Sequence, residues 1–374
     1  MKPGKYYIQS WAATMIKYDD IFSIPPYSLD KNQKKEIFIN RLSYLTAHHI
    51  KSCKAYKNML DGIYFNADNV NDVADFPFLP VSLFKNLDLC SVDENEVIKT
   101  MTSSGTTGQQ VSKIFLDKIT ASNQQRAFVK IVSDFTGASR LPLMIIDTPT
   151  VMKDRNLFSA RGAGILGFSI FASDKIFCLD DAMNIDVDAI ERFLSKHKDK
   201  KILLFGFTFM VWQHFYKVVK EKNIKIDLSN AVLIHGGGWK KLQSEAVSQS
   251  DFCSLLKGTF DINQIVDYYG MVEQTGCIYM ECEHGHLHAS SFSDIIIRNP
   301  KDFSVLPNGF PGIIQVLSLL PESYPGHSLL TEDVGVILGE DNCPCGRLGK
   351  YFKVLGRLQN AELRGCSDTY ASQF

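Results

Sequence analysis

The middle of the chain alternates short apolar runs with segments of helical periodicity. The apolar runs are Leu143–Ile146, Lys201–Phe205 and Ala231–Ile234, and amphipathic segments lie at Val187–His197 and Phe209–Lys222. Short, nearly uninterrupted apolar runs are typical of strands that are buried on both faces. Strands that alternate with helices in this way predict an α/β fold with largely buried strands.

The regions on either side of this alternation carry different patterns. Residues Asp30–Leu60 show helical periodicity with Lys and Asn on the polar side, which predicts a helical N-terminal cap. From Ile278 onward, strand-like runs are separated by Pro and Gly turns, which predicts a β-rich subdomain over about residues 278–350. These runs are His286–His288, Asp294–Arg298, Gly312–Leu319 and Val334–Leu338.

Composition indicates a globular protein and disfavours two kinds of partner. The 374 residues are 45% hydrophobic, which is enough apolar material for one large core or two ordinary ones. Lys and Arg number 40 against 41 Asp and Glu, so no global field favours nucleic acid or an anionic membrane. The longest apolar run, Ile202–Trp212, is too short to span a bilayer.

The N-terminus and the cysteines predict a cytoplasmic location. Charged residues interrupt the apolar residues of Met1–Ile21, so this segment lacks the apolar core of a signal peptide. Nine cysteines in a long chain without such a signal are typical of reduced thiols in a cytosol. Clustered cysteines are then expected to be metal ligands or nucleophiles.

One loop is rich in hydroxyl groups and glycine, a composition suited to phosphate binding. Its residues are Thr102, Ser103, Ser104, Gly105, Thr106, Thr107 and Gly108. Glycines let backbone N–H groups approach phosphate oxygens, and the hydroxyls add further donors. The loop is not a Walker A sequence because it lacks the Gly-Lys-Ser/Thr ending. Taken alone, it is equally compatible with a surface turn.

Four further motifs follow the loop in an order that resembles the adenylate-forming superfamily of acyl-CoA synthetases and firefly-type luciferases. They are Gly236-Gly237-Gly238, Tyr269-Gly270-Met271-Val272-Glu273, Thr331-Glu332-Asp333 and Gly356-Arg357. The resemblance implies a large adenylate-forming domain with mixed sheets flanked by helices. It also implies ATP and Mg²⁺ as cofactors, with the hydroxyl-rich loop on the phosphates and the three glycines beside the adenine.

The same resemblance implies roles for single residues. It makes Glu273 a Mg²⁺ ligand and catalytic residue, places Tyr269 and Gly270 near the adenine, and assigns Asp333 to the ribose hydroxyls. Arg357 would contact the ribose or a phosphate. The structural alternative for each carboxylate is a solvated side chain or a helix cap.

The C-terminus narrows the resemblance to one branch. The superfamily normally continues past its hinge motif with a small domain that carries a catalytic lysine, whereas this chain has 17 residues after Arg357, which leaves Lys113 and Lys350 as possible substitutes. The ending is similar to the acyl-protein synthetases of the bacterial bioluminescence fatty-acid reductase complex, in which a C-terminal cysteine accepts the acyl group. This assigns Cys366 as the nucleophile, and we expect an adenylation domain over residues 1–355 and a tail over 356–374.

The resemblance therefore predicts a two-step ligase. A carboxylic acid, by resemblance a long-chain fatty acid, is activated as acyl-AMP, and the acyl group then passes to Cys366 for delivery to an acyl reductase partner. Two alternatives stay open: an acyl-CoA or aryl-CoA ligase of the phenylacetate-CoA ligase type, and a non-catalytic nucleotide-binding assembly subunit. The aromatic segment Phe205–Phe209 suits an acyl pocket and a core strand equally well.

The remaining candidate site is a group of cysteines and histidines. Cys343-Pro344-Cys345 follows a β-run, and Cys282 lies upstream beside His284, His286 and His288. Together they allow a tetrahedral zinc site with three cysteines and one histidine. Similarity to segments of phenylacetate-CoA ligases suggests His288 as the histidine. The alternative is a set of reduced, partly buried cysteines without a metal.

Overall fold

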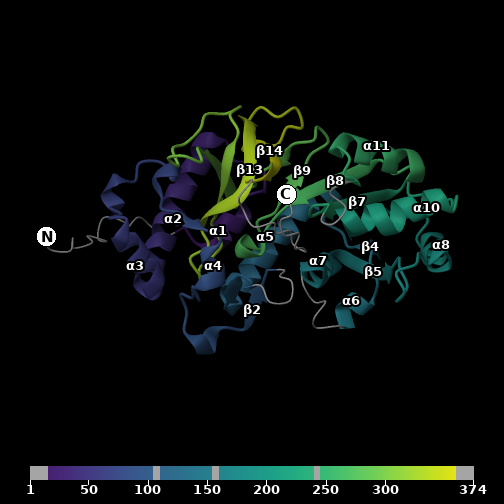
Figure 1. Cartoon of the computed structure of the whole chain (residues 1–374), viewed down its shortest axis with the longest axis horizontal. Coiled ribbons are helices and arrows are strands. Elements are labelled where there is room, and N and C mark those ends of the chain that lie inside the picture. Colours follow the sequence, from purple (N-terminus) through teal and green to yellow (C-terminus); the bar gives the residue numbers. More distant parts are fainter. Residues whose placement is uncertain (1–15, 104–109, 154–159, 240–244, 359–374) are drawn as a thin grey trace, which may run out of the picture. The chain divides into compact units, whose positions relative to one another are not determined.

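The computed structural model describes residues 16–103, 110–153, 160–239 and 245–358, and Figure 1 labels their helices and strands. The chain divides into two compact units. The described part of the first unit comprises residues 16–103, 110–131 and 270–358, and that of the second comprises residues 132–153, 160–239 and 245–269. Within these ranges, no helix combines the length and the apolarity that crossing a bilayer requires.

The second unit is built on a parallel sheet with the strand order β5-β4-β6-β7-β8. The strands are β4 (Leu141–Ile145), β5 (Ala172–Phe177), β6 (Ile202–Phe207), β7 (Ala231–Gly236) and β8 (Gln264–Tyr269). Every residue of β6 and β7 is buried, as expected for central strands that are covered on both faces. The prediction of an α/β fold with buried strands is confirmed.

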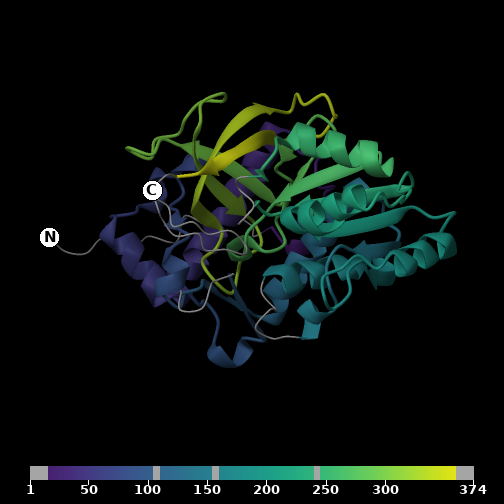
Figure 2. The same ribbon diagram turned by 45° about the vertical axis from the view of Figure 1, so that its right-hand side comes forward.

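Helices connect the strands of this sheet. They are α6 (Thr150–Lys153), α7 (Ala160–Phe168), α8 (Val187–Lys196), α9 (Thr208–Met210), α10 (Lys217–Glu221) and α11 (Gln249–Phe260), with a π-helical segment at Val211–Tyr216. Side chains from α8, the π-helical segment and α11 form one core cluster with Met144, Leu204 and Leu233 of the strands. Figure 2 shows the teal and green helices of this unit running alongside its strands. The apolar side chains of the crossovers therefore supply the core.

The first unit contains an antiparallel sheet with the strand order β11-β12-β13-β14-β10-β9. Its strands are β9 (Tyr279–Glu281), β10 (Leu287–His288), β11 (Ser293–Arg298), β12 (Gly312–Ser318), β13 (Ser328–Glu340) and β14 (Lys350–Arg357). The short strand β1 (Leu79–Pro80) pairs with β13 in parallel. A separate hairpin joins β2 (Lys99–Thr102) to β3 (Lys113–Leu116). Each strand-like run that the sequence places after Ile278 overlaps one of these strands.

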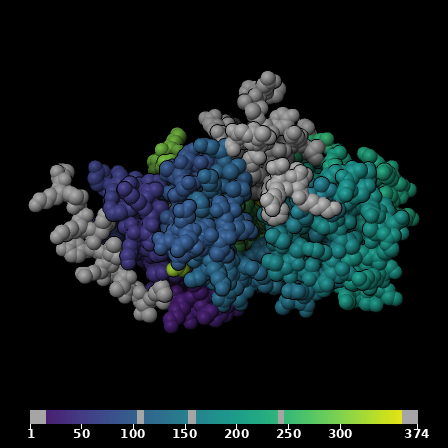
Figure 3. Space-filling model, turned by 90° about the horizontal axis from the view of Figure 1, so that it is seen from below, coloured from purple at the N-terminus to yellow at the C-terminus, as the bar shows by residue number. Residues whose placement is uncertain are grey.

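Helices complete the first unit. They are α1 (Tyr18–Ser23), α2 (Lys31–Ser52), α3 (Lys54–Gly62), α4 (Leu83–Asn86) and α5 (Lys118–Thr136), of which α5 ends in the second unit. Helix α2 begins at a capping box, because the Asp30 side chain accepts hydrogen bonds from the N–H groups of Asn32 and Gln33. Its apolar face buries Phe38, Leu42 and Leu45 completely. The purple and blue N-terminal residues form most of the face of this unit that Figure 3 shows.

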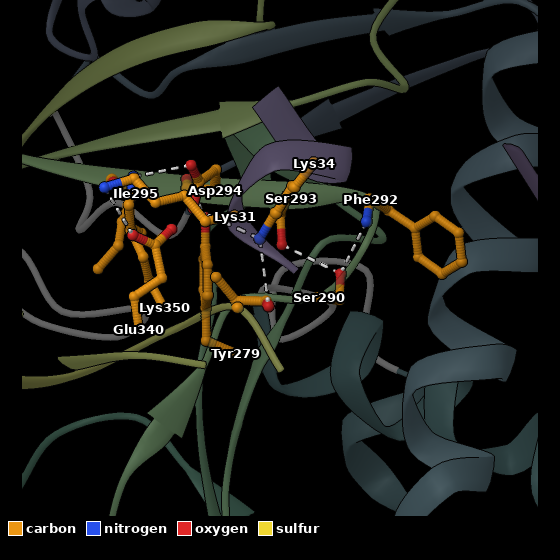
Figure 4. A network of polar contacts seen from close by, with 12 residues as sticks. Lys31, Lys34, Tyr279, Ser290, Phe292, Ser293, Asp294, Ile295, Glu340 and Lys350 are labelled. Atoms are coloured by element: carbon orange, nitrogen blue, oxygen red, sulfur yellow. Dashed lines mark hydrogen bonds and ion pairs between the residues drawn. The ribbon is translucent and has the colours of Figure 1, made fainter. Parts of the chain in front are cut away.

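A buried ion-pair network joins α2 to the antiparallel sheet (Figure 4). Asp294 on β11 lies between the buried Lys34 and the partly buried Lys350, with its Oδ1 3.4 Å from Lys34 Nζ and its Oδ2 2.8 Å from Lys350 Nζ. Lys350 Nζ also donates a hydrogen bond to the carbonyl oxygen of Ile295, at 2.9 Å. Burial lowers the pKa of Lys34. Burial also acts to lower the pKa of Lys350, but the neighbouring Asp294 carboxylate outweighs it, so the pKa of Lys350 is raised. Lys350 is thus a structural cation of the sheet.

The other lysine that the sequence leaves as a candidate is Lys113, the first residue of β3. Its ammonium group lies 3.2 Å from the Asp88 carboxylate, and both side chains are about half exposed or more. An exposed pair of this kind contributes little to stability. Lys113 therefore points toward solvent in the described structure.

Candidate active site

The ends of the hydroxyl-rich loop are fixed by the β2–β3 hairpin. Thr102 faces Lys113 in the register of the two strands. One step further along, the Ser103 N–H donates to the Ser112 carbonyl oxygen at 3.1 Å, and the Ser112 N–H donates to Ser103 Oγ at 2.9 Å. The structure thereby closes the loop between Ser103 and Ser112. The other predicted loop residues, Ser104, Gly105, Thr106, Thr107 and Gly108, lie outside the described residues.

Glu273 is held in a short 3₁₀ turn at Val272–Gln274 that follows β8 in sequence. Gln274 anchors the turn, since its side-chain amide donates to the carbonyl oxygens of Val316 (3.1 Å) and Gly326 (3.0 Å). The Tyr324 hydroxyl donates to the Glu273 carbonyl oxygen at 2.9 Å. These hydrogen bonds fix the backbone of the turn at Glu273 and at the residue that follows it.

The Glu273 carboxylate is buried among polar groups of the first unit. Only 8% of the residue is exposed. Burial raises the pKa of this carboxyl, whereas polar contact with the Ser112 side chain and the charge of Arg357 lower it, and Glu332 raises it again. Among the described residues, no lysine or arginine forms an ion pair with this buried carboxylate, which favours a bound cation as its partner, and a hard oxygen ligand suits Mg²⁺. Glu273 therefore fits the role of metal ligand that the sequence predicts.

The structure brings the predicted Asp333 and Arg357 together. The two residues face each other in the register of β13 and β14, and Arg357 Nε lies 3.4 Å from Asp333 Oδ1. The Thr331 hydroxyl accepts the Asp333 N–H at 3.1 Å and donates to the Ile314 carbonyl oxygen at 2.7 Å, which ties this end of β13 to β12. Both charged side chains keep some exposure, 16% for Asp333 and 31% for Arg357. A partly exposed carboxylate of this kind is suited to accepting hydrogen bonds from ligand hydroxyls.

In the second unit, the three glycines begin at the carboxyl end of β7. Gly236 faces Tyr268 of β8 in register, and a Cβ atom at Gly236 would lie 2.5 Å from the Tyr268 ring, so only glycine fits. Gly237 has a φ of +78°, which a residue with a side chain rarely adopts. Tyr269 is the last residue of β8. Ligands of open parallel sheets bind at the carboxyl ends of the strands, which is where Gly236–Gly238 and Tyr269 lie.

The aromatic segment Phe205–Phe209 belongs to the end of β6 and the helix after it. Phe205 and Phe207 are buried, and Phe205 stacks on Phe168 of α7 with ring centroids 4.1 Å apart. A Cβ atom at Gly164 of α7 would approach both Phe205 and Phe207 within 3.2 Å. These two rings are therefore part of the core, and they form its boundary at the carboxyl edge of the sheet.

The cysteines and histidines singled out in the sequence meet at one point of the first unit. One ligand atom from each of Cys282, His288, Cys343 and Cys345 lies within 4.8 Å of all the others. Cys282 Sγ and Cys343 Sγ are 3.9 Å apart, and Cys345 Sγ is 3.4 Å from His288 Nε2. Zn–S bonds of about 2.3 Å at tetrahedral angles place two sulfurs about 3.8 Å apart, close to the observed separation. Burial lowers the pKa of His288 to about 3, so its ring is neutral, the form that binds metal.

Cys366, the predicted nucleophile, lies outside the described residues. The last described residue is Leu358, whose N–H donates to the carbonyl oxygen of Glu332 at 3.1 Å. The segment that contains Cys366 therefore leaves the described structure beside the Asp333–Arg357 pair.

Some residues of the two units were not expected from the sequence. Ser112 and Glu332 adjoin Glu273, and in the second unit Arg161 of α7 forms a buried ion pair with Asp147. Asp147 lies two residues after the end of β4, and a charged residue just after an apolar strand is the signal that could have identified it. No sequence pattern distinguishes Ser112 from the other hydroxyl residues near the loop, because its burial depends on strand pairing.

Comparison with solved structures defines the class of protein. The chain resembles a 2-hydroxyisobutyryl-CoA ligase in an open conformation, in complex with 2-HIB-AMP and CoA, with a TM-score of 0.67, 14% identity, and coverage of 89% of this chain and 77% of that one. A second structure of that ligase, in the postadenylation state with 2-HIB-AMP, gives a TM-score of 0.68 at 13% identity, covering 89% of this chain and 70% of that one. The fold is that of an adenylate-forming ligase, as the motifs predict.

Sequence comparison then narrows the class to a family. Residues 8–374 match the family described as acyl-protein synthetase, LuxE, and the chain belongs to this family. It is 25% identical over 361 residues to the long-chain-fatty-acid–luciferin-component ligase of Aliivibrio fischeri, covering 95% of this chain and 93% of that one. The ligase of the same name from Vibrio harveyi is 22% identical over 370 residues, covering 97% and 95%. The predicted resemblance to acyl-protein synthetases is confirmed.

Proposed function

We propose that this protein uses Mg·ATP to activate a long-chain fatty acid as acyl-AMP and then transfers the acyl group to Cys366. The observation that carries the proposal is the position of Glu273 in the first unit. This buried carboxylate adjoins Ser112, which closes the hydroxyl-rich loop, and the charge of Arg357 lowers the pKa of the carboxyl. Family membership and the names of the two relatives supply the substrate class.

In the first half-reaction, the residues of the chain bind and orient the substrates. The loop that begins at Thr102 and Ser103 supplies N–H and hydroxyl donors to the phosphates, and Glu273 would hold the Mg²⁺, whose positive charge would offset the negative charge of the triphosphate during attack on the α-phosphate. Asp333 accepts hydrogen bonds from the ribose hydroxyls while Arg357 contacts the ribose or a phosphate.

On the adenine side, we assign binding of the base to backbone and ring atoms of Gly236–Gly238, Tyr269 and Gly270. The Tyr268 ring leaves no room for a side chain at Gly236. Because Gly236–Gly238 carry no side chains, a ligand can approach the backbone of this loop closely. Apart from Arg357, which lies two residues beyond its boundary, the substrate-binding residues that we propose belong to an adenylation domain over residues 1–355.

In the second half-reaction, the thiolate of Cys366 attacks the acyl carbon of the mixed anhydride. A C–S bond forms, the C–O bond to the phosphate breaks and AMP leaves, while the thiol proton is released to solvent. The thioester remains reactive enough to pass its acyl group to a protein partner, which we propose is an acyl reductase. The tail over residues 356–374 carries this step.

Radiolabelled long-chain fatty acid tests both half-reactions in the full-length protein. Incubation with Mg·ATP is expected to label the protein in a hydroxylamine-labile form, and Cys366→Ser is expected to lose that label while keeping fatty-acid-dependent ATP–pyrophosphate exchange. Cys90→Ser is the control, because Cys90 is a free, half-buried cysteine of the described structure. Label that persists on Cys366→Ser would overturn the acceptor assignment.

The same assay separates the two alternatives. A CoA ligase of the phenylacetate-CoA ligase type would form acyl-CoA with free CoA at an unchanged rate in Cys366→Ser. A non-catalytic nucleotide-binding subunit would show no exchange with any carboxylate.

We also propose that Cys282, His288, Cys343 and Cys345 hold a structural zinc ion. Their convergence within 4.8 Å and the 3.9 Å sulfur separation support the assignment. The ion would link the β9–β10 region to the chain that enters β14. Cysteine pairs of this kind stay reduced in the cytoplasm, where we place the protein.

Metal analysis tests the zinc assignment directly. About one zinc per chain is expected in the purified protein, with loss of that zinc and a lower unfolding midpoint in Cys343→Ser. Cys53→Ser is the matched control, since Cys53 is buried but lies outside the cluster. A zinc-free protein that unfolds at the same temperature with and without added zinc would contradict the assignment.

A further inference from the structure

Ser112 lies at the meeting point of the loop closure and Glu273. Its backbone is fully used, because its carbonyl oxygen accepts from the Ser103 N–H and its N–H donates to Ser103 Oγ. Its side chain is completely buried. No described atom completes a hydrogen bond of normal length and angle with Ser112 Oγ, although the hydroxyl lies near enough to Glu273 for a polar contact.

A buried hydroxyl without a hydrogen-bond partner is costly, so its presence calls for an explanation. Solvation does not provide one, since the residue has no exposed surface. Packing does not provide one either, because an alanine would fill most of the same volume without burying an oxygen. The Glu273 carboxylate, with which the Ser112 side chain interacts, is an acceptor of the kind that this hydroxyl lacks.

We propose that Ser112 is a positioning residue that donates a hydrogen bond to the Glu273 carboxylate when Mg·ATP binds. The hydroxyl then holds the carboxylate in the orientation that ligates Mg²⁺, in the way that residues behind metal ligands usually orient them. Since Ser112 also closes the hydroxyl-rich loop, it couples the loop that receives the phosphates to the residue that receives the metal. This inference rests on the proposed function, which supplies the ligand.

Calorimetric measurement of ATP binding, with EDTA and with Mg²⁺, tests the inference without requiring turnover. In EDTA, Ser112→Ala and the wild type are expected to bind ATP within twofold of each other. In Mg²⁺, the wild type gains affinity, and Ser112→Ala is expected to lose about 10-fold of that gain. Equal losses in both conditions would indicate a merely structural role, and an undiminished gain would also overturn the inference.

Two further variants identify the route of the effect. In a Glu273→Gln background, Ser112→Ala is expected to cause no additional loss, because coupled residues are not additive. Ser291→Ala is the control, since Ser291 is a buried serine whose hydroxyl donates to the Pro25 carbonyl oxygen. It is expected to leave ATP binding unchanged. An additive loss in the double variant would contradict the route through Glu273.

A further variant separates an effect on folding from an effect on ATP binding. Ser112→Cys preserves the volume with a weaker donor and decides the question if Ser112→Ala does not fold: it is expected to show a partial loss in Mg²⁺, and a full gain would overturn the inference. Wild-type protein that binds Mg·ATP but shows no fatty-acid-dependent exchange would sink the proposed function and leave the role of Ser112 standing. If the wild type shows fatty-acid-dependent exchange and Ser112→Ala binds Mg·ATP as tightly as the wild type, the proposed function would stand and the role of Ser112 would be contradicted.

Discussion

The sheets of the two units are stabilised mainly by different kinds of buried side chain, although the second unit also buries Asp147 in an ion pair with Arg161. The parallel sheet of the second unit is covered by an apolar cluster to which α8, the π-helical segment and α11 all contribute. The antiparallel sheet of the first unit instead buries charges and imidazoles, among them Asp294 between two lysines and the stacked rings of His49 and His327. Apolar packing tolerates exchange between residues of similar size, whereas buried charges depend on particular partners. The first unit should therefore respond more sharply to the loss of single polar groups.

The largest expected effect comes from Asp294→Ala. The change removes the carboxylate that pairs with both the buried Lys34 and the partly buried Lys350 and leaves only the more distant charge of Glu340, and removing one partner of a buried ion pair costs about 3–5 kcal/mol. Urea unfolding followed by circular dichroism measures the loss. If the free energy of unfolding falls by less than about 1 kcal/mol, solvent reaches the lysines and the two units depend on buried charge to a similar extent.

A smaller loss is expected from Leu204→Ala in the second unit. Leu204 is almost completely buried in the apolar cluster, and truncation of a buried leucine costs about 2–5 kcal/mol, less where neighbours close the cavity. If the units unfold in separate transitions, Leu204→Ala and Asp294→Ala are expected to shift different transitions. A common shift in both variants would instead show that the two cores unfold as one.

Acid should destabilise the protein through its buried histidines. Burial lowers the pKa of His327 to about 3, so the folded state stays unprotonated where the unfolded chain, with an ordinary pKa near 6.5, takes up a proton. This stability is fully present above pH 6.5 and is lost progressively as the pH falls toward 3. His327→Gln is expected to reduce the slope of unfolding free energy against pH, between pH 6 and 5, by roughly 1.4 kcal/mol per unit. An unchanged slope would contradict the assignment.

The smallest effect is expected at the surface of the second unit. Lys196 Nζ lies 2.8 Å from Asp174 Oδ2, but the lysine side chain is 66% exposed. Exposed ion pairs contribute about 0–1 kcal/mol, so Lys196→Ala should unfold nearly as the wild type does. A loss comparable to that of Asp294→Ala would mean that burial does not govern the strength of these pairs.

Regular elements were readable from the sequence where one face or both faces are apolar. The runs at Leu143–Ile146 and Ala231–Ile234 match strands β4 and β7 to within two residues at each end, because a short uninterrupted apolar run is typical of a buried strand. The segment Phe209–Lys222 is helical as predicted, but its centre is a π-helical turn at Val211–Tyr216. Hydrophobic periodicity does not distinguish the two types of helix over so short a stretch.

The candidate site was predictable only in part. Asp333 and Arg357 could be named from motifs, and strand pairing brings them within 3.4 Å. The partners that act at long range could not be named: Lys34 and Asp294 are separated by 260 positions, and the burial of Ser112 follows from a hairpin register. Such pairings depend on the three-dimensional fold, which a local pattern does not encode.

The hydrogen bond from Leu358 to Glu332 has a consequence for where an acyl chain can be delivered. It fixes the position of the last described residue, and Cys366 lies eight residues further along the sequence. At about 3.5 Å per fully extended residue, the thiol cannot travel beyond roughly 30 Å from that anchor. A tether confines its cargo at a high effective concentration near the anchor. If Cys366 is the acyl acceptor that we propose, a reductase that collects the acyl group must bring its own catalytic centre inside that radius.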